Sequence, residues 1–264
     1  MTNIELSEKY IIWFDEYVNS FIKSHPDLKE NLMLKLVHSK NVREEIIGIA
    51  KDIHLDKENL FLAEILGLFH DIGRFEQYAK YKTFSDSDSQ NHAELGVKVL
   101  KEEDVLKHLT AENRELIYKA ILNHSKAEIP ANETERAIFF SKLIRDADKL
   151  DIWRLITEYY MVKEEKTNRS LELGLPDNPD ISEHVVQSII KKEIVKKEDM
   201  KTLNDFKLLQ IAWVFDLNFN FSRIRLKQKG FLKKIFDALP DNDKVKQIKN
   251  IVDKELSVME TKEK

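Results

Sequence analysis

The sequence predicts an all-α protein. Its 264 residues include only six glycines and five prolines, so residues that favour turns are scarce, whereas Glu, Lys, Leu and Ile are abundant. Apolar residues also recur at the three- and four-residue spacing of a helix, as in Ile11, Phe14 and Val18. No internal repeat and no linker divides the pattern. We therefore expect a single all-α domain over residues 1–264, large enough for a sizeable core.

In the first part of the chain, apolar positions at helical spacing predict helices over residues 7–24, 29–52, 57–70 and 92–103. The first ends before Pro26, because the residue that precedes a proline disfavours helix. The third can start at Asp56, a good capping residue, and it contains Gly67, which leaves room for a closely packed neighbouring helix. Residues 75–91 are polar and rich in serine, so we expect a loop there.

In the second part, the same spacing predicts helices over residues 111–124, 133–163, 181–198, 204–225 and 241–260. A proline marks a loop over 125–132, and a glycine with two prolines favours a loop or lid over 164–182. We interpret the helices of about 181–260 as a C-terminal extension of the domain.

The composition argues against several classes of function. The chain carries 43 Lys and Arg against 47 Asp and Glu, a net charge of -4, which argues against general nucleic-acid binding. Without cysteine, any metal ion must be held by His, Asp, Glu or other oxygen donors. No apolar run approaches the roughly 20 residues that span a bilayer, and the first ten residues lack a signal-peptide pattern, so we expect a cytoplasmic protein without membrane contact.

Four potential metal ligands lie beside apolar positions on three of the predicted helices: His38, His70, Asp71 and Asp148. A buried charge is costly unless another charge compensates it. Two histidines and two aspartates form a neutral set with one divalent metal ion. Such a set leaves coordination positions open for water and substrate, which is typical of a catalytic site.

The order and context of these residues resemble the HD-domain superfamily of metal-dependent phosphohydrolases. Three stretches carry the resemblance, namely His38-Ser39, Leu68-Phe69-His70-Asp71-Ile72-Gly73-Arg74 and Asp146-Ala147-Asp148-Lys149-Leu150-Asp151. The resemblance covers about residues 30–155 and implies a helical bundle that holds the metal. Family members carry the last aspartate in an Ala-Asp setting, which implies that Asp148 is the ligand, while Asp146 and Asp151 form salt bridges or support the ligands.

Resemblance to a binuclear subset, which includes the HD-GYP branch, implies roles for two further histidines, His92 and His124. If both bind metal, Asp71 bridges two ions. If not, they act as acid/base groups beside a single ion, and both possibilities stay open. The chain lacks a Gly-Tyr-Pro segment and has Asn123 where that branch often has histidine, so specificity for cyclic dinucleotides is not supported. The metal is divalent (Mn, Mg, Fe, Ni, Co or Zn), with one or two ions per chain.

The activity that the resemblance implies is hydrolysis of a phosphoester or phosphoanhydride in a nucleotide or another small phosphorylated metabolite. Asp71, Arg74, His92 and His124 are the predicted catalytic residues. The guanidinium of Arg74 suits a phosphate oxygen, although a surface salt bridge is an equal alternative. Lys149 either adds positive charge for the substrate or is a solvated helix residue.

Two other functions stay open, a di-iron oxygenase of the HD fold and a metal-free sensor or scaffold. The aromatic residues near the 75–91 loop either stack a base or, more often in proteins, pack the loop onto the core; they are Phe75, Tyr78, Tyr81 and Phe84. A homodimer is compatible with the sequence.

Overall fold

The computed structural model describes residues 2–162, 168 and 170–261, and every regular element in these residues is a helix. The predicted all-α class is therefore confirmed. The chain divides into two compact units, Met1–Asp151 and Ile152–Lys264. This division does not test the expected single domain, because compactness alone does not show that a unit folds independently. In the described residues, no helix is both long and apolar enough to cross a membrane.

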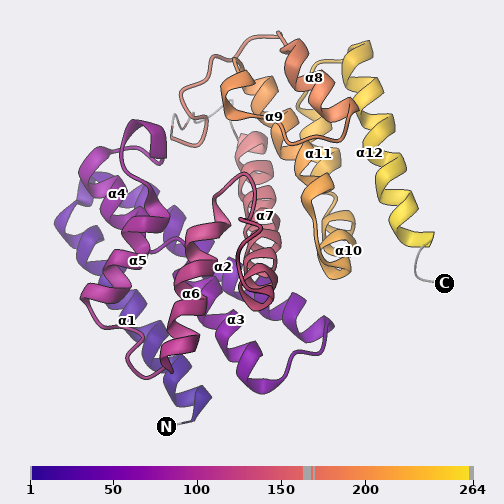
Figure 1. Cartoon of the computed structure of the whole chain (residues 1–264). Coiled ribbons are helices and arrows are strands. Elements are labelled where there is room, and N and C mark those ends of the chain that lie inside the picture. The colour runs from indigo at the N-terminus through magenta and orange to yellow at the C-terminus, as the bar shows by residue number, and fades with distance from the viewer. Residues whose placement is uncertain (1, 163–167, 169, 262–264) are drawn as a thin grey trace. The chain divides into compact units, whose positions relative to one another are not determined.

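The first unit contains six complete helices and the start of a seventh (Figure 1), which are α1 (Asn3–Ser24), α2 (Lys29–Asp52), α3 (Lys57–Phe69), α4 (Gly73–Tyr81), α5 (His92–Glu102), α6 (Ala111–His124) and α7 (Glu135–Val162). The predicted helices end within a few residues of these bounds. As expected, the Asp56 side chain caps α3 by accepting a hydrogen bond from the backbone N–H of Asn59.

The expected loop over residues 75–91 is wrong in its first half, where α4 lies. Phe75 and Tyr78 are one helical turn apart and both are buried, so these aromatic side chains form the apolar face of a short helix. The helix ends at Lys82, which adopts a left-handed conformation with φ 56°. Irregular chain and one 3₁₀ turn, Asp86–Asp88, then lead to α5.

A glycine allows α3 to pack closely against α2, as the sequence predicts. A Cβ atom at Gly67 would lie 2.7 Å from Ile46 Cγ2 and 2.8 Å from Arg43 Cα. Only a residue without a side chain fits this contact. The close approach of α2 and α3 brings His38, on α2, near His70, which directly follows α3.

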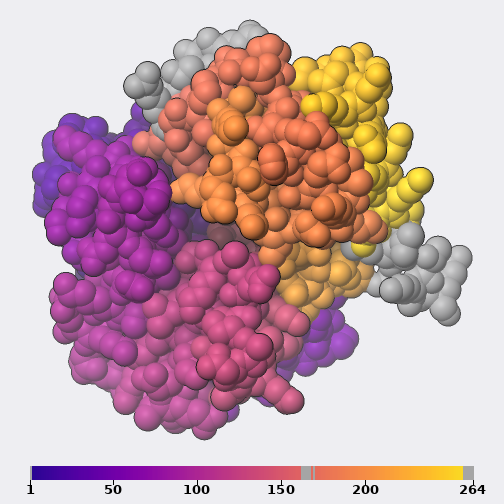
Figure 2. Space-filling view, turned by 45° about the horizontal axis from the view of Figure 1, so that its top comes forward, coloured from indigo at the N-terminus to yellow at the C-terminus, as the bar shows by residue number. Residues whose placement is uncertain are grey.

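A second glycine contact joins α4 to α5. A Cβ atom at Gly73 would lie 2.1 Å from the backbone oxygen of His92 and 2.5 Å from the backbone nitrogen of Gly96. The first turns of the two helices are therefore in direct backbone contact. On the face that Figure 2 shows, the purple segment that contains α4 and α5 adjoins the pink segment of the chain that follows it. This packing holds Arg74 and His92 on neighbouring helices.

The described residues of the second unit form the C-terminal part of α7 and five further α-helices, α8 (Glu183–Ile190), α9 (Leu203–Ala212), α10 (Asn220–Lys229), α11 (Phe231–Asp237) and α12 (Asp243–Thr261). The predicted helix over 181–198 ends at residue 190. The predicted helix over 204–225 is divided, because a 3₁₀ turn follows α9 and Phe219 is extended before α10 begins. Gly230, at φ 63°, separates α10 from α11. The sequence pattern did not predict α11.

The predicted loop or lid over 164–182 lies partly outside the described residues, since 163–167 and 169 are not among them. Its described residues form turns and contain no helix.

We predict that Gly73→Ala destabilises the protein by about 1–3 kcal/mol, as overpacking typically does, because the backbone atoms that its Cβ meets cannot rotate away. Gly96→Ala is the matched control at the same contact, where the nearest atom is a side-chain carbon of Ile72 at 3.2 Å. Thermal denaturation of both variants checks this. An equal melting temperature for the two variants would contradict it.

Candidate metal centre

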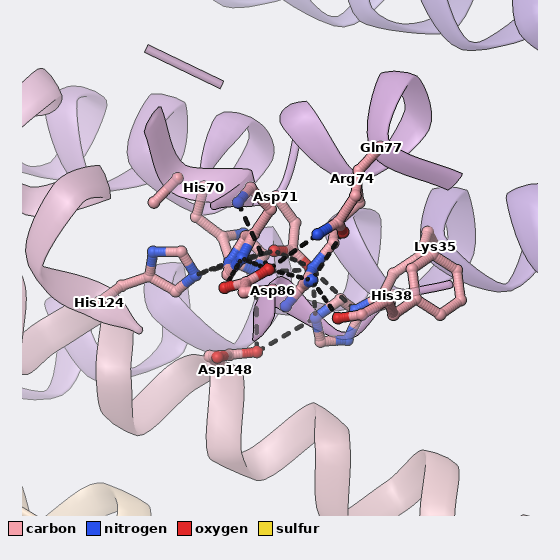
Figure 3. A network of polar contacts seen from close by, with 12 residues as sticks. Lys35, His38, His70, Asp71, Arg74, Gln77, Asp86, His124 and Asp148 are labelled. Atoms are coloured by element: carbon pink, nitrogen blue, oxygen red, sulfur yellow. Dashed lines mark hydrogen bonds and ion pairs between the residues drawn. The ribbon is translucent and has the colours of Figure 1, made fainter. Parts of the chain in front are cut away.

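All six side chains predicted as metal ligands come together in the first unit (Figure 3), and these are His38, His70, Asp71, His92, His124 and Asp148. They form three overlapping groups in which the potential ligand atoms lie within 4.8 Å of one another. They come from α2, the turn after α3, the start of α5, the end of α6 and the middle of α7. Five are buried, and Asp148 is partly exposed. The site is therefore a tertiary assembly with one accessible side chain.

Asp71 lies between two pairs of histidines. Its Oδ2 atom is 3.6 Å from His38 Nε2 and 3.9 Å from His70 Nε2. Its Oδ1 atom is 3.3 Å from His92 Nε2 and 3.7 Å from His124 Nε2. The two oxygens of one carboxylate thus face different imidazole pairs.

Asp148 forms ion pairs with one of these pairs, since its Oδ1 atom is 3.1 Å from His38 Nε2 and 3.6 Å from His70 Nε2. It also lies near the other pair, because the ligand atoms of Asp148, His70 and His124 are within 4.8 Å of one another. We call His38, His70, Asp148 and Asp71 Oδ2 the first half-site. His92, His124 and Asp71 Oδ1 form the second half-site.

The four imidazoles share one orientation. Each Nδ1 atom faces an oxygen acceptor: His38 faces Asp151 Oδ2 at 2.7 Å, His70 the Gly67 carbonyl at 2.9 Å, His92 Asp86 Oδ2 at 2.8 Å, and His124 the Ile121 carbonyl at 2.6 Å. A carbonyl or carboxylate can only accept, so each Nδ1 carries the proton. In a neutral imidazole, Nε2 then has a free lone pair, and all four Nε2 atoms point to Asp71 or Asp148. This is the arrangement that metal-binding histidines adopt.

The donor set fits a metal ion. His38 Nε2 and His70 Nε2 are buried and have no hydrogen-bond partner in the part of the chain that the structure describes. His92 Nε2 and His124 Nε2 lie only 3.1 Å apart, although both Nδ1 atoms already carry the protons. Buried lone pairs without a donor are unfavourable. A cation shared by these nitrogens and carboxylates would satisfy them, and nitrogen and oxygen donors suit divalent transition metals.

The protonation states of Asp71, Asp148 and His92 agree with metal binding. For His38, by contrast, burial lowers the pKa, but contacts with Asp148 and Asp151 outweigh this effect and raise the pKa of the imidazole. Burial raises the pKa of Asp71, but the charges of Lys35, His70 and Arg74 outweigh this effect and hold the pKa well below its usual value. Burial also raises the pKa of Asp148, and its contacts with His38 and His70 reverse the shift in the same way. Burial and the Arg74 charge lower the pKa of His92 to about 3, so this imidazole is neutral at pH 7. The carboxylates are thus ionised and His92 is free of its second proton, as ligands must be.

Arg74 lies beside the centre and is mostly buried. Its Nε atom is 3.5 Å from Asp71 Oδ1, and its Nη1 atom donates to the Phe84 carbonyl at 2.6 Å and to Asp86 Oδ1 at 3.0 Å. Arg74 therefore forms salt bridges, as the alternative expected, but they lie at the site, and its role toward a phosphate stays a prediction.

The remaining sequence predictions have mixed outcomes. Lys149 is buried on α7 next to Asp148, so the alternative of a solvated lysine is wrong, while a role toward substrate stays a prediction. Asp151 supports His38, as expected of a residue behind a ligand. Phe75 is buried in the core, and Tyr78 and Phe84 stack on each other with ring centroids 4.4 Å apart. These three rings pack the loop onto the core.

Two residues of the site were missed from the sequence. Lys35 donates a hydrogen bond from Nζ to Asp71 Oδ2 at 2.8 Å. Asp86 accepts from His92 Nδ1 and from Gln77 Nε2, the latter at 2.8 Å. The position of Lys35, one helical turn before His38, was a usable signal, because residues three apart share a helix face. Asp86 lies in a serine-rich segment with no periodic pattern that could have identified it.

Comparison with known families agrees with this geometry. The family model described as HD domain matches residues 36–153, which contain all six candidate ligands. No curated protein and no solved structure gives a significant match. The match confirms the family resemblance that the motifs indicate, including the spacing of His38, His70-Asp71 and Asp148. Residues 36–153 are therefore an HD domain, a member of a superfamily made up mostly of metal-dependent hydrolases.

Proposed function

We propose that this chain is a metal-dependent phosphohydrolase that cleaves a phosphoester or phosphoanhydride in a small phosphorylated molecule, such as a nucleotide. The observation that carries the proposal is the convergence of four imidazole Nε2 atoms and two ionised carboxylates on one buried centre, with a lysine and an arginine beside it. The nitrogens and carboxylates suit a divalent metal, and the two cations suit a phosphate group.

We further propose that the centre holds two ions. The first half-site would hold one with His38, His70, Asp148 and Asp71, and the second half-site would hold the other with His92, His124 and Asp71. When bound, such ions lower the pKa of a water molecule toward neutrality and polarise a phosphoryl oxygen. The two oxygens of Asp71 face different imidazole pairs, which supports a bridging position.

The protein side chains position these groups. Asp86 fixes the ring of His92 through Nδ1, and the low pKa of His92 favours a role as ligand over a role as proton donor. Arg74 is anchored through Nη1 to the segment that contains Phe84 and Asp86. Its Nε atom is buried and has no hydrogen-bond partner among the described residues, so an N–H donor of a fixed guanidinium is available at the centre for a phosphoryl oxygen.

We predict that Asp71→Asn lowers phosphatase activity at least about 100-fold, because it removes the charge that both half-sites share. The test is a screen of aryl phosphates, nucleoside mono- and triphosphates and cyclic dinucleotides with each of the six metals. His108→Ala is the matched control, since this histidine is exposed. Full activity of Asp71→Asn would contradict the proposal. So would an iron-loaded, coloured protein that consumes oxygen and hydrolyses none of these phosphates.

For the number of ions, we predict that wild-type protein contains two per chain and that His124→Ala contains one, because the second half-site then keeps only His92 and one oxygen of Asp71. Elemental analysis of metal-saturated protein after gel filtration measures this. His108→Ala should retain two ions. One ion per chain in the wild type would refute the two-ion proposal and leave the first half-site alone.

We predict that Asp86→Ala weakens metal binding at the second half-site by roughly 10- to 100-fold, the usual effect of removing a carboxylate behind a histidine ligand. Asp88→Ala, in the same 3₁₀ turn but exposed, is the control and should bind as the wild type does. Titration with a competing chelator gives both affinities. Equal affinities would show that Asp86 does not support His92.

A further inference from the structure

Lys35 is held at the edge of the candidate metal centre. It lies on α2 one turn before His38, and its Nζ atom donates to Asp71 Oδ2 at 2.8 Å. The same Nζ atom lies over the ring of Phe84, 5.4 Å from the ring centroid. The side chain is 15% exposed, so the ammonium group lies between a buried carboxylate and an aromatic ring.

The ammonium group of Lys35 has unused hydrogen-bond donors. It carries three N–H bonds, and among the described contacts Asp71 is its single hydrogen-bond acceptor. The metal-ligand role proposed for Asp71 does not require this lysine, because the ions themselves would neutralise the carboxylate. The remaining donors can therefore serve a negatively charged group that enters the centre.

Arg74 approaches the same carboxylate from its other oxygen. Its Nε atom is 3.5 Å from Asp71 Oδ1, whereas Lys35 contacts Oδ2, so each half-site has one cation beside it. Both cations also contact one residue, since Arg74 Nη1 donates to the carbonyl of Phe84 and Lys35 lies over its ring. Phe84 thereby contacts both positive groups. Figure 3 shows Lys35 and Arg74 at the edge of the cluster, near Asp71.

The sum of the charges at the centre indicates a role for the side chains of Lys35 and Arg74. Four carboxylates belong to the centre. Asp71 and Asp148 are candidate ligands, and Asp86 and Asp151 accept hydrogen bonds from ligand histidines. Two divalent ions would balance these four charges, and the histidines are neutral ligands. The charges of Lys35 and Arg74 are then in excess, and they match the two negative charges of a phosphate monoester or a terminal phosphate. A phosphate diester carries only one.

We propose that Lys35 and Arg74 form a two-cation clamp for the substrate phosphate, which makes the site selective for phosphate monoesters and terminal phosphates over phosphate diesters. The inference rests on the proposed phosphohydrolase function and adds to it a substrate class and a specificity residue, Lys35. In this role the ammonium and the guanidinium together bind the three non-bridging oxygens and two negative charges of a monoester, whereas a diester has only two such oxygens and one charge.

The test compares Lys35→Met with Lys40→Met. Lys40 lies on the same helix, but its ammonium pairs with Asp15 and its side chain is 45% exposed. Three quantities are measured on protein loaded with Mn²⁺: the ion content, the affinity for inorganic phosphate by calorimetry, and kcat/KM for p-nitrophenyl phosphate and bis(p-nitrophenyl) phosphate.

We expect Lys35→Met to keep its metal ions and to bind inorganic phosphate roughly 10- to 100-fold more weakly, the usual effect of losing a hydrogen bond between charged groups. The ratio of monoester to diester activity should fall at least about tenfold. Lys40→Met should match the wild type in all three quantities. Lys35→Arg, which keeps the charge, should restore part of the phosphate affinity. This result would show that the loss in Lys35→Met is not caused by a folding defect.

The outcomes separate the clamp from the proposed function. The clamp would be overturned if Lys35→Met bound inorganic phosphate as tightly as the wild type, or if the wild-type protein hydrolysed the diester faster than the monoester. Either result would leave the hydrolase standing. Phosphate binding that requires Lys35, in a protein that hydrolyses neither phosphate esters nor the phosphoanhydrides of nucleoside triphosphates, would support the clamp and overturn the hydrolase.

Discussion

A buried, ionised carboxylate, Asp71, is the constraint on which the first unit depends. It lies directly after a helix that is buried over most of its length, where an uncompensated charge would cost several kcal/mol. The compensation comes from five other helices, since Lys35 and His38, Arg74, His92, His124 and Asp148 all approach the carboxylate or its ligands. These groups reach Asp71 only if the helix axes pass close together, and the glycine contacts of α3 with α2 and of α4 with α5 allow this. The packing of the bundle and the chemistry of the centre therefore depend on each other.

The orientation of the four histidines has two different physical origins. His70 and His124 donate to the carbonyl three residues earlier in their own chain segment, so local structure alone sets their tautomers. His38 and His92 depend on carboxylates, and the partner of His38, Asp151, is 113 residues away in sequence. Each half-site thus combines one histidine oriented by a carbonyl three residues earlier with one oriented by a carboxylate outside its own helix turn, and in the first half-site that carboxylate is distant in sequence. Folding of the whole first unit is needed before either half-site is complete, which couples metal affinity to tertiary structure.

Much of this could be predicted from the sequence, and the misses have physical causes. Long amphipathic helices were predictable because helical periodicity is a local property. The six candidate ligands were predictable through the resemblance of their motifs to a known family, which left the role of His92 and His124 open. The helix α4 was missed since a polar, serine-rich segment follows its apolar face directly. Lys35 contacts a residue 36 positions away, and the only local sign of this was its place one helical turn before His38. Asp86 contacts His92, six positions away, from a segment without any periodic pattern. The break between α9 and α10 was missed because the apolar residues continue across the 3₁₀ turn.

The arrangement also bears on whether the centre can be a metal-free scaffold. Two buried imidazole lone pairs have no hydrogen-bond partner, and two others face each other at 3.1 Å. Each unsatisfied buried polar atom costs about 1–3 kcal/mol, comparable in sum to a large part of the stability of a domain. A scaffold gains nothing from this cost, and apolar residues of similar volume would remove it. A bound divalent ion offsets the cost, because it turns the same lone pairs into ligands. The physical chemistry of the donors thus favours an HD domain that functions with metal bound.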